Sequence, residues 1–286
     1  MSEATTVAVL GAGIMANTVA KTLHAQGFEL RRYNRTTAAI DGPAIVCASP
    51  AQAAEGAAAV WSFVHDDKAS RSVWFGEEGA LGTAAHAIVI ESSTLTPTYA
   101  GLWMRKAAEA TARPVLAPVT GSRPGAENGT LVAFTAGATA DRAAADPLLR
   151  VVAQEVIHVG PAPAAATVKL LNNALASVII TGLAETLDAA TVLGLDLKQL
   201  VEVWSRYGWA APVASAYGAA MVRGAHPLTD CSVAVIAKDL HYLRTALGES
   251  VPPLISAASD RFQHAMARGA GDQEMSAISE AVEPPS

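Results

Sequence analysis

The sequence predicts an α/β N-terminal half, a long central helix and an all-α C-terminal part. Strand-like runs alternate with Ala-rich helical stretches over the first half, which is typical of βαβ units around a mostly parallel sheet. From about Thr167, apolar residues recur at helical spacing instead. The run Gly160-Pro161-Ala162-Pro163 is expected to interrupt regular structure between these two textures. We therefore expect three parts, at residues 1–164, 165–195 and 196–286.

The individual elements are predicted from the same patterns. Short β-like runs predict strands at residues 7–10, 30–33, 59–64, 87–92 and 115–118. The apolar spacing from Leu170 to Val192, with Gly194 just beyond it, predicts one long and mostly buried helix. Further helices are expected at residues 197–207, 211–222, 232–247 and 252–268, followed by a frayed tail at 280–286.

Charge and hydropathy exclude two classes of partner. The chain has 286 residues with 20 Lys and Arg against 26 Asp and Glu, which gives a formal net charge of −6. No basic excess is available to neutralise phosphates, so we expect no nucleic-acid partner. The charge-free apolar stretch 170–184 contains Asn172 and Asn173 and is shorter than the roughly 18 to 20 apolar residues of a bilayer span. We therefore expect no membrane partner.

The cysteines and the N-terminal residues favour a cytoplasmic location. Cys47 and Cys231 form no CxxC pair and no Cys/His cluster, so neither a disulfide framework nor a metal site is indicated. The strand-like Val7 to Leu10 runs straight into glycines, which is not the pattern of an export signal.

A glycine pattern follows the first predicted strand at once. The residues Gly11-Ala12-Gly13-Ile14-Met15-Ala16 match GxGxxA, with a helical stretch and a second strand behind them. Gly11 permits the tight turn, Gly13 lets the backbone approach a pyrophosphate at the helix N-terminus, and Ala16 allows close packing of helix on strand. We expect Gly11, Gly13, Ile14 and Met15 to bind a dinucleotide; the alternative is a plain strand-turn-helix.

The end of the second strand predicts which dinucleotide is used. About 20 residues past the glycines, where NAD-binding sites usually carry Asp or Glu for the ribose, this chain has Asn34, Arg35 and Thr36. No carboxylate repels a 2′-phosphate there, and a guanidinium is available to bind one. We therefore predict NADP(H) as the cofactor. The alternative is that Arg31, Arg32 and Arg35 form an ordinary solvated charge run.

Three further segments carry a family resemblance. The segment Leu116-Ala117-Pro118-Val119-Thr120-Gly121-Ser122, continued to Leu131, resembles the β-hydroxyacid dehydrogenase family, whose usual segment reads D-A-P-V-S-G-G and then A-x-x-G-T-L. Lys169-Leu170-Leu171-Asn172-Asn173 is similar to the K-x-x-N-N of that family, and Lys238-Asp239-Leu240 to its K-D-L. With Gly11 to Ala16 and Glu91-Ser92-Ser93-Thr94, these landmarks span nearly the whole chain in family order.

The resemblance implies a fold, a reaction and a set of residues. The fold is a Rossmann dinucleotide-binding domain, an interdomain helix and a helical domain for substrate binding and dimerisation. The reaction is hydride transfer between nicotinamide and a small β-hydroxy acid, semialdehyde or keto acid. Lys169 is the implied proton donor, and Asn173 is implied to orient the substrate or to hold Lys169. The implied substrate contacts are Thr120, Gly121, Ser122 and Lys238, and the further cofactor contacts are Val64, Thr94 and again Lys238.

The residues themselves agree with these roles. Thr120-Gly121-Ser122 is a small polar turn after a predicted strand, so its N–H groups and hydroxyls suit a carboxylate. Lys169 and Asn173 are four apart, which places both on one helix face. The alternatives are an ordinary Gly/Ser loop for the turn and a solvated lysine at a helix end for Lys169.

Departures from the family pattern keep other functions open. The G-x-x-G-x-G usual before the lysine is replaced by Gly160-Pro161-Ala162-Pro163-Ala164-Ala165, Thr120 stands where Ser is usual, and Ser122 replaces a glycine. Four aromatic residues crowd one C-terminal stretch, either on the substrate side or in a core or subunit contact: Trp204, Tyr207, Trp209 and Tyr217.

An imine reductase on the same scaffold is therefore the alternative, although such enzymes typically carry Asp or Tyr where this chain has Lys169. A non-catalytic NADP-binding protein is a further alternative, and intact Lys169, Asn173 and Lys238 argue against it. Self-association as a homodimer or a higher homo-oligomer is the expected partnership, because the short helical part follows a long apolar helix.

Overall fold

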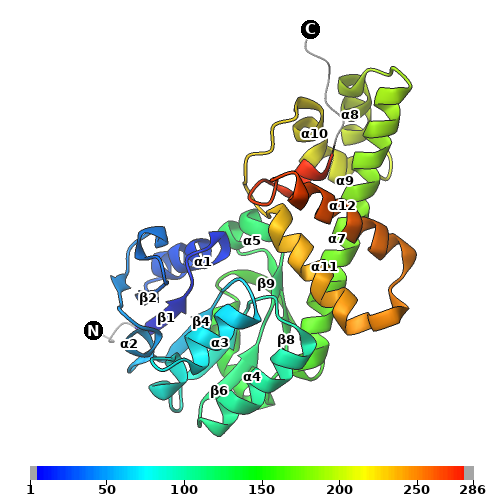
Figure 1. Cartoon of the computed structure of the whole chain (residues 1–286). Coiled ribbons are helices and arrows are strands. Elements are labelled where there is room, and N and C mark those ends of the chain that lie inside the picture. The colour runs from blue at the N-terminus through cyan, green and yellow to red at the C-terminus, as the bar shows by residue number, and fades with distance from the viewer. Residues whose placement is uncertain (1–4, 280–286) are drawn as a thin grey trace. The chain divides into compact units, whose positions relative to one another are not determined.

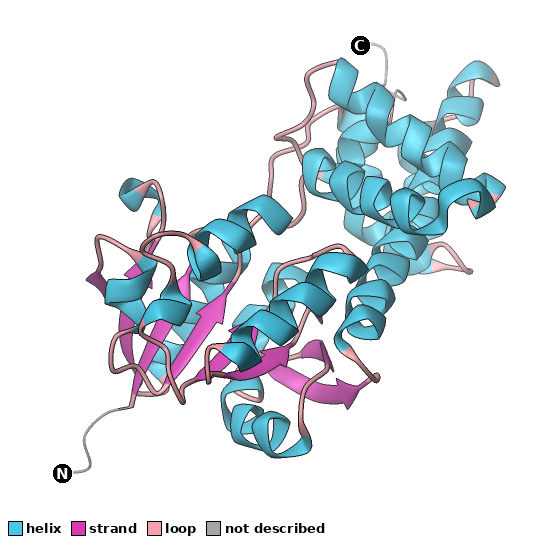
Figure 2. Cartoon of the chain, turned by 60° about the horizontal axis from the view of Figure 1, so that its bottom comes forward, coloured by secondary structure: helices cyan, strands magenta, loops and turns pink. Residues whose placement is uncertain are grey.

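The structure is a computed structural model that describes residues 5–279. The tail expected at 280–286 lies outside the described residues. Contacts divide the chain into two compact units, residues 1–169 and residues 170–286. In Figure 2 every strand belongs to the first unit, and the second consists of helices and loops. The predicted order of an α/β part, a long helix and an all-α part is thereby confirmed, whereas the division at residues 164 and 195 stays a prediction.

A six-stranded parallel sheet forms the centre of the N-terminal unit. Its order is β3-β2-β1-β4-β5-β6, so the chain reverses direction across the sheet between β1 and β4. The strands are β1 (Thr6–Leu10), β2 (Glu29–Tyr33), β3 (Ile45–Val46), β4 (Ala59–Ser62), β5 (Ile88–Glu91) and β6 (Arg113–Leu116). This order is that of the Rossmann fold, in which ligands bind at the carboxyl edge where the order reverses.

Helices cover both faces of this sheet (Figure 1). Alternate residues of β1 point to opposite sides, because the side-chain period of a strand is two. Ala8 and Leu10 join the core under α2 (Pro50–Ala54), α3 (Asp67–Phe75) and α4 (Pro97–Glu109). Val7 and Val9 join the core under α1 (Ile14–Ala25), α5 (Ser122–Asn128) and α6 (Thr139–Leu149).

A second, three-stranded sheet continues this unit. It consists of β7 (Val119–Thr120), β8 (Leu131–Thr135) and β9 (Ala153–His158); β7 runs antiparallel to β8, and β9 runs parallel to it. The sequence patterns did not predict β8 and β9. The strand predicted at 115–118 overlaps only the end of β6, because β6 ends at Leu116 and β7 begins at Val119, with Pro118 between them.

The long helix α7 spans Ala162–Val192 and begins earlier than expected. The prolines at 161 and 163 were expected to interrupt regular structure, but Pro163 lies in the first turn of the helix. A proline is tolerated there because the first N–H groups of a helix have no partner inside it. The helix therefore includes residues that were expected to form a loop.

Helix α7 is apolar on almost every side. By length and composition alone it could cross a bilayer: its most apolar 18-residue window has a mean hydropathy of 1.4, and 39% of that window is buried. One such helix is weak evidence, because the core helix of a soluble protein passes the same test. Leu170, Ala174 and Leu187 are buried, whereas Leu171, Leu175 and Ile179 are exposed.

The C-terminal unit packs shorter helices on the rest of α7. These are α8 (Leu197–Arg206), α9 (Ala211–Val213), α10 (Ala219–Arg223), α11 (Val233–Leu247) and α12 (Pro253–Ala267). A π-helical turn at Ala214–Gly218 joins α9 to α10, so the helix expected at 211–222 is present but irregular. Leu183, Ile236, Leu240 and Phe262 lie in the core of this unit.

Candidate active site and cofactor site

The glycine turn lies at the carboxyl edge of the sheet, where the strand order reverses. Gly11 has φ +113°, and a Cβ atom there would overlap the carbonyl oxygen of Phe63 at the end of β4. Its N–H donates to the Tyr33 carbonyl oxygen at 2.8 Å, which ties β1 to the end of β2. Only glycine combines this conformation with so close an approach. The turn therefore requires Gly11, as the fingerprint predicts.

Helix α1 presents an open N-terminus just after this turn. Gly13 is its N-cap and provides no side-chain cap, and a Cβ there would meet nothing within 4 Å. Ile14 and Met15 begin the helix and are partly exposed. Unpartnered N–H groups at a positive helix end suit a pyrophosphate. This part of the chain therefore fits the phosphates of a dinucleotide.

The residues expected at the ribose end follow β2. Asn34 is partly buried and its Nδ2 donates to the Thr36 carbonyl oxygen at 2.8 Å, which closes a small turn. Arg35 and Thr36 are exposed. Strands β1 and β2 are parallel neighbours, so the turn after β1 and the loop after β2 lie at the same edge of the sheet. Asn34, Arg35 and Thr36 are therefore on the same edge as Gly11.

Arg32, two residues before Asn34, is fully buried, so it does not belong to a solvated charge run. Burial lowers the pKa of its guanidinium to about 10, and the nearby charge of Asp41 opposes that shift. Arg31 is half-buried and donates to the Glu55 carbonyl oxygen. Of the three arginines considered as a charge run, Arg35 alone is exposed.

Val64 and Thr94 lie in the two loops that follow β4 and β5. The Val64 N–H donates to Ser93 Oγ at 2.8 Å, so the two loops are joined directly beside the glycine turn. The buried carboxylate of Glu91 accepts the Ser93 N–H at 2.8 Å and therefore organises this junction. Sequence reasoning gave Glu91 no role.

Glu91 is the centre of a buried hydrogen-bond network. Its Oε2 accepts from Ser70 Oγ at 2.6 Å and from Trp74 Nε1 at 2.7 Å, and both partners come from α3. The Tyr99 hydroxyl donates to Ser70 Oγ at 3.2 Å. Burial raises the pKa of Glu91 above the usual range, and these hydrogen bonds oppose that shift.

The polar turn at 120–122 lies between β7 and α5. Gly121 has φ +117° and Ser122 has φ +61°, so two successive residues are left-handed. Thr120 and Ser122 are partly exposed, and Gly121 is exposed. Consecutive N–H groups in such a turn form a concavity that suits an anion. The serine is strained where the resembled family carries a glycine.

The landmarks of the second half centre on Asn173, Lys238 and Asp239. Lys169 is half-buried and lies one turn before Asn173 in α7. Asn173 Nδ2 donates to Asp239 Oδ2 at 2.5 Å, and Lys238 Nζ lies 2.7 Å from Asp239 Oδ1. The Lys238 ammonium is also 4.9 Å from the centre of the Tyr242 ring. Asn173 and Lys238, which are 65 positions apart, are therefore joined through one buried carboxylate.

Asp239 is the residue of this group that sequence reasoning missed. It is 1% exposed and holds both partners, although no role was assigned to it within the Lys238-Asp239-Leu240 segment. An acid beside a lysine on a helix is usually a surface residue, so the sequence alone carried little signal. Its burial is visible only once α7 and α11 are packed together.

The four aromatic residues of the C-terminal stretch do not form one wall. Trp204 and Tyr217 pack against the helical core, whereas Tyr207 and Trp209 are exposed. Burial raises the pKa of the Tyr217 hydroxyl well above its usual range. The interpretation of Trp204 and Tyr217 as packing residues is therefore favoured.

Family comparisons agree with both halves of the chain. Residues 6–160 match a family model described as the NAD binding domain of 6-phosphogluconate dehydrogenase. Residues 163–282 match one described as "NAD-binding of NADP-dependent 3-hydroxyisobutyrate dehydrogenase". An NAD-dependent L-serine dehydrogenase of Pseudomonas aeruginosa is 28% identical, covering 97% of this chain and 98% of the relative.

Solved structures show the same fold. A 3-hydroxyisobutyrate dehydrogenase from Salmonella typhimurium has a TM-score of 0.85 at 23% identity, covering 96% of this chain and 98% of its own. An imine reductase from Streptomyces aurantiacus has a TM-score of 0.64 at 22% identity, with coverage of 96% and 98%. The glycine turn, the two matched regions and the landmark order together establish that this chain belongs to the β-hydroxyacid dehydrogenase family of NAD(P)-dependent oxidoreductases.

Proposed function

We propose that this enzyme is an NADPH-dependent reductase that interconverts a small β-hydroxy acid with the matching semialdehyde or keto acid. The observation that carries the proposal is the buried Asn173–Asp239–Lys238 group, with Lys169 one helical turn before Asn173. L-serine and 3-hydroxyisobutyrate, the substrates in the names of similar proteins, are both small β-hydroxy acids.

Lys169 is the proposed proton donor. The nicotinamide, when bound, supplies the hydride that reduces the carbonyl carbon. Negative charge then develops on the carbonyl oxygen, and the Lys169 ammonium donates its proton there to form the alcohol. Solvent returns a proton to the amine. In the oxidative direction a neutral Lys169 accepts the alcohol proton.

Asn173 and the turn at 120–122 have positioning roles in this proposal. Asp239 fixes the amide nitrogen of Asn173, which sets the orientation of the amide beside Lys169. The left-handed turn at Gly121 and Ser122 supplies N–H groups and a hydroxyl for the substrate carboxylate. Lys238, held by Asp239, is a proposed N–H donor to an acidic substrate.

The proposed preference for NADP(H) rests on the loop after β2. Arg35 is exposed, Asn34 and Thr36 are its neighbours, and no carboxylate occupies this stretch. A guanidinium can bind a phosphate through two hydrogen bonds. Arg35→Ala is therefore expected to weaken the binding of NADPH and to leave that of NADH nearly unchanged.

Self-association through α7 is part of the proposal. Leu171, Leu175 and Ile179 are four residues apart in turn, so they form one exposed apolar stripe on this helix. A second copy of the chain is the proposed cover, and Leu175→Glu is expected to convert a homodimer into a monomer in light scattering. An unchanged mass would contradict this interface.

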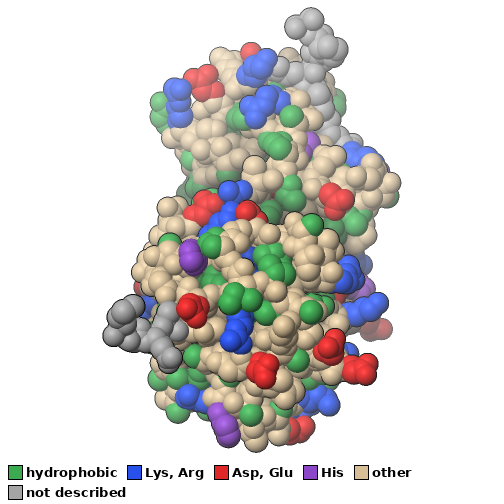
Figure 3. Space-filling model, turned by 90° about the vertical axis from the view of Figure 1, so that its left-hand side faces the viewer, with side chains coloured by type: hydrophobic (Ala, Val, Ile, Leu, Met, Phe, Trp, Pro, Cys, Tyr) green, Lys and Arg blue, Asp and Glu red, His purple; other side chains and the backbone are tan. Residues whose placement is uncertain are grey.

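The remaining partner and location proposals rest on simpler observations. Acidic and basic side chains are interspersed on the face shown in Figure 3, which supports a small-molecule substrate over a nucleic acid. Cys47 and Cys231 form no disulfide, which supports the cytoplasm.

The test follows NADPH absorbance with purified protein against two matched panels. The first panel contains small aldehyde and keto acids, and the second contains cyclic imines. Oxidation of NADPH with the acids, and loss of that activity in Lys169→Ala, is the expected result. Turnover of imines alone would replace the proposal by the alternative, an imine reductase. Silence on both panels would leave a non-catalytic NADP-binding protein.

A further inference from the structure

Strand β2 contains an arginine at a position where its pattern requires an apolar residue. Leu30 and Arg32 point to the same side of the sheet, since side chains alternate along a strand. Leu30 is buried in the core under α1, and Arg32 is 0% exposed. A buried guanidinium costs free energy that an apolar side chain would not. Its presence therefore calls for a role beyond filling the core.

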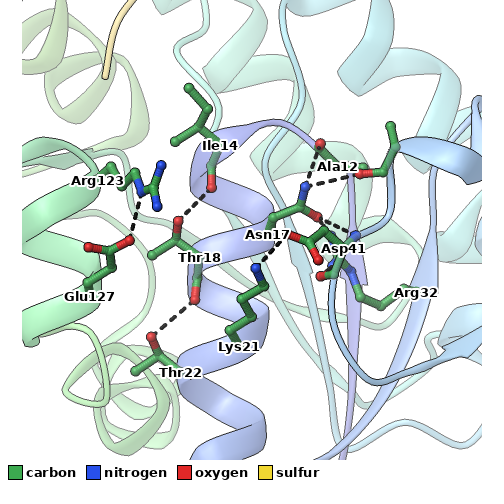
Figure 4. Close-up of polar contacts among 11 residues, drawn as sticks. Ala12, Ile14, Asn17, Thr18, Lys21, Thr22, Arg32, Asp41, Arg123 and Glu127 are labelled. Carbon is green, nitrogen blue, oxygen red and sulfur yellow. Dashed lines mark hydrogen bonds and ion pairs between the residues drawn. The ribbon is translucent and has the colours of Figure 1, made fainter. Parts of the chain in front are cut away.

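The Arg32 guanidinium joins β2 to the glycine turn and to the loop beyond it. Its Nη2 donates to the Gly11 carbonyl oxygen at 2.8 Å and to Asn17 Oδ1 at 2.8 Å. Its Nη1 donates to the Asp41 carbonyl oxygen at 3.2 Å. Figure 4 shows Arg32 and Asp41 meeting Asn17 beside the start of α1. One side chain thus binds three separate segments of the unit.

Asn17 completes the same connection from α1. Its Nδ2 donates to the carbonyl oxygens of Ala12 and Ala39, both at 3.0 Å, and its Oδ1 also accepts the Asp41 N–H at 3.3 Å. The Asn17 amide therefore donates hydrogen bonds through its nitrogen and accepts them through its oxygen. Its orientation is fixed because Arg32 donates to the oxygen.

Arg32 forms no salt bridge with a carboxylate within residues 5–279. Asp41 contributes its backbone to the contact, and its carboxylate instead pairs with Lys21 at 2.5 Å on the surface. Arg32 Nε is buried without a hydrogen-bond partner among the described residues. The three hydrogen bonds from Nη1 and Nη2 all go to carbonyl and amide oxygens, which identifies Arg32 as a clamp on backbone and amide groups and not as half of an ion pair.

The clamp holds the far end of the loop that begins with Asn34, Arg35 and Thr36. The near end is held by the Gly11 N–H on the Tyr33 carbonyl oxygen, and the far end by Arg32 and Asn17 at residues 39–41. Between these two points the short helical turn Thr37–Ala39 limits the conformational freedom of the loop. Arg35, itself exposed, is thus carried by a loop fixed at both ends against the glycine turn.

We propose that Arg32 is a positioning residue that sets the preference for NADP(H): it holds the 34–41 loop so that Arg35 and Thr36 stay placed for a 2′-phosphate. This inference rests on the proposed cofactor preference. Arg32 also bonds the Gly11 carbonyl oxygen, but the glycine turn is held independently by the Gly11 N–H on the Tyr33 carbonyl oxygen and by the start of α1. Loss of Arg32 therefore affects the 2′-phosphate selectively.

The test compares Arg32→Leu with Arg31→Leu, a matched loss of one arginine from the same strand. Dissociation constants for NADPH and NADH are measured by fluorescence titration, and the melting temperature of the free protein is measured alongside. Arg32→Leu is expected to lower the preference for NADPH at least about tenfold with NADH binding nearly unchanged. Arg31→Leu is expected to keep the preference of the wild type.

Three outcomes would overturn the inference. An equal loss for both cofactors would make Arg32 a general support of the turn, and an unchanged preference would make it a core residue only. A wild type that binds NADH as well as NADPH would remove the proposed cofactor preference as well. If the wild type prefers NADPH and Arg35→Ala abolishes that preference while Arg32→Leu does not, the positioning role alone fails.

A second variant covers the case in which Arg32→Leu does not fold. Asn17→Ala breaks the same connection from α1 without touching β2, and it is expected to lower the NADPH preference as well. The double variant Arg32→Leu with Asn17→Ala should lose no more preference than the larger single loss, since the two side chains act as one clamp. Additive losses would contradict a shared clamp.

Discussion

The two units use a buried charge in opposite ways. In the N-terminal unit the cation Arg32 forms no ion pair with any residue that the structure describes and fixes the oxygen end of Asn17, so it organises backbone loops around the glycine turn. In the C-terminal unit the anion Asp239 is paired with Lys238 and fixes the nitrogen end of Asn173. The difference indicates that one buried charge holds the loop proposed to bind the cofactor, whereas the other orients the side chains proposed for chemistry.

Lys169→Ala is expected to have the largest effect and to separate chemistry from binding. Loss of the proposed proton donor should lower kcat by roughly 10²- to 10⁴-fold, with the affinity for NADPH nearly unchanged. Single-turnover absorbance gives the first quantity and fluorescence titration the second. Lys198→Ala, an exposed lysine of α8, is the control. Full turnover in Lys169→Ala on the true substrate would remove Lys169 as the donor.

Asp239→Ala tests whether the charge in the C-terminal unit supports structure as well as orientation. Removing the carboxylate leaves the Lys238 ammonium and the Asn173 amide without their buried partner. We expect the free energy of unfolding to fall by about 2–4 kcal/mol in urea denaturation. Asp260→Ala is the matched control, because that carboxylate is 70% exposed in its pair with Arg244 and should cost less than about 1 kcal/mol. Equal losses of unfolding free energy in Asp239→Ala and Asp260→Ala would show that Asp239 stabilises the fold no more than a surface carboxylate does.

Glu91 predicts a pH dependence for the N-terminal unit. Burial raises its pKa in the folded protein above the usual 4.5, so the folded state keeps a proton that the unfolded chain has lost. The contribution of Glu91 to the free energy of unfolding is therefore fully present below the pKa of the unfolded chain. It is lost as pH rises through the raised pKa of the folded protein, with a slope of at most about 1.4 kcal/mol per pH unit. Urea denaturation from acid to neutral pH measures this slope.

Glu91→Gln is the control for that slope, because an amide does not titrate. The difference in unfolding free energy between wild type and variant should change with pH in the stated direction and then level off. A difference that is constant with pH would mean that the Glu91 carboxyl keeps its ordinary pKa despite burial.

Local turn chemistry explains which parts of the fold the sequence could predict. Gly11 was predictable because a strand followed by a tight turn and a helix needs a left-handed residue, and the structure gives it φ +113°. The start of α7 was predicted too late because prolines were taken as breakers, although a first turn accepts them. Strands β8 and β9 were not predicted, although Leu131 and Ala153, which pair between them, are closer in sequence than Val7 and Ala59, which pair between two predicted strands.

The candidate site was predictable where a motif carries it and not where burial decides. Asn173 and Lys238 came from the family resemblance, but the Asp239 carboxylate that joins them contacts Asn173 only when two helices pack, and the two residues are 66 positions apart. Arg32 entered the sequence interpretation only through the alternative of a solvated charge run, because its oxygen partners, at Gly11, Asn17 and Asp41, are distant in the chain. Such contacts leave no local signal in a sequence.

Ser122→Gly is expected to have the smallest effect and to test the strain at the proposed carboxylate turn. Ser122 has φ +61°, a conformation that costs a serine about 1 kcal/mol and a glycine almost nothing. The greater freedom of glycine in the unfolded chain offsets part of the gain, so unfolding free energy should rise by less than about 1 kcal/mol. Ser122→Ala keeps the strain and removes only the hydroxyl. A higher KM for the acidic substrate in both variants would show that the hydroxyl contacts the substrate carboxylate. A lower free energy of unfolding in Ser122→Gly would mean that the serine side chain stabilises the fold by more than its backbone strain costs.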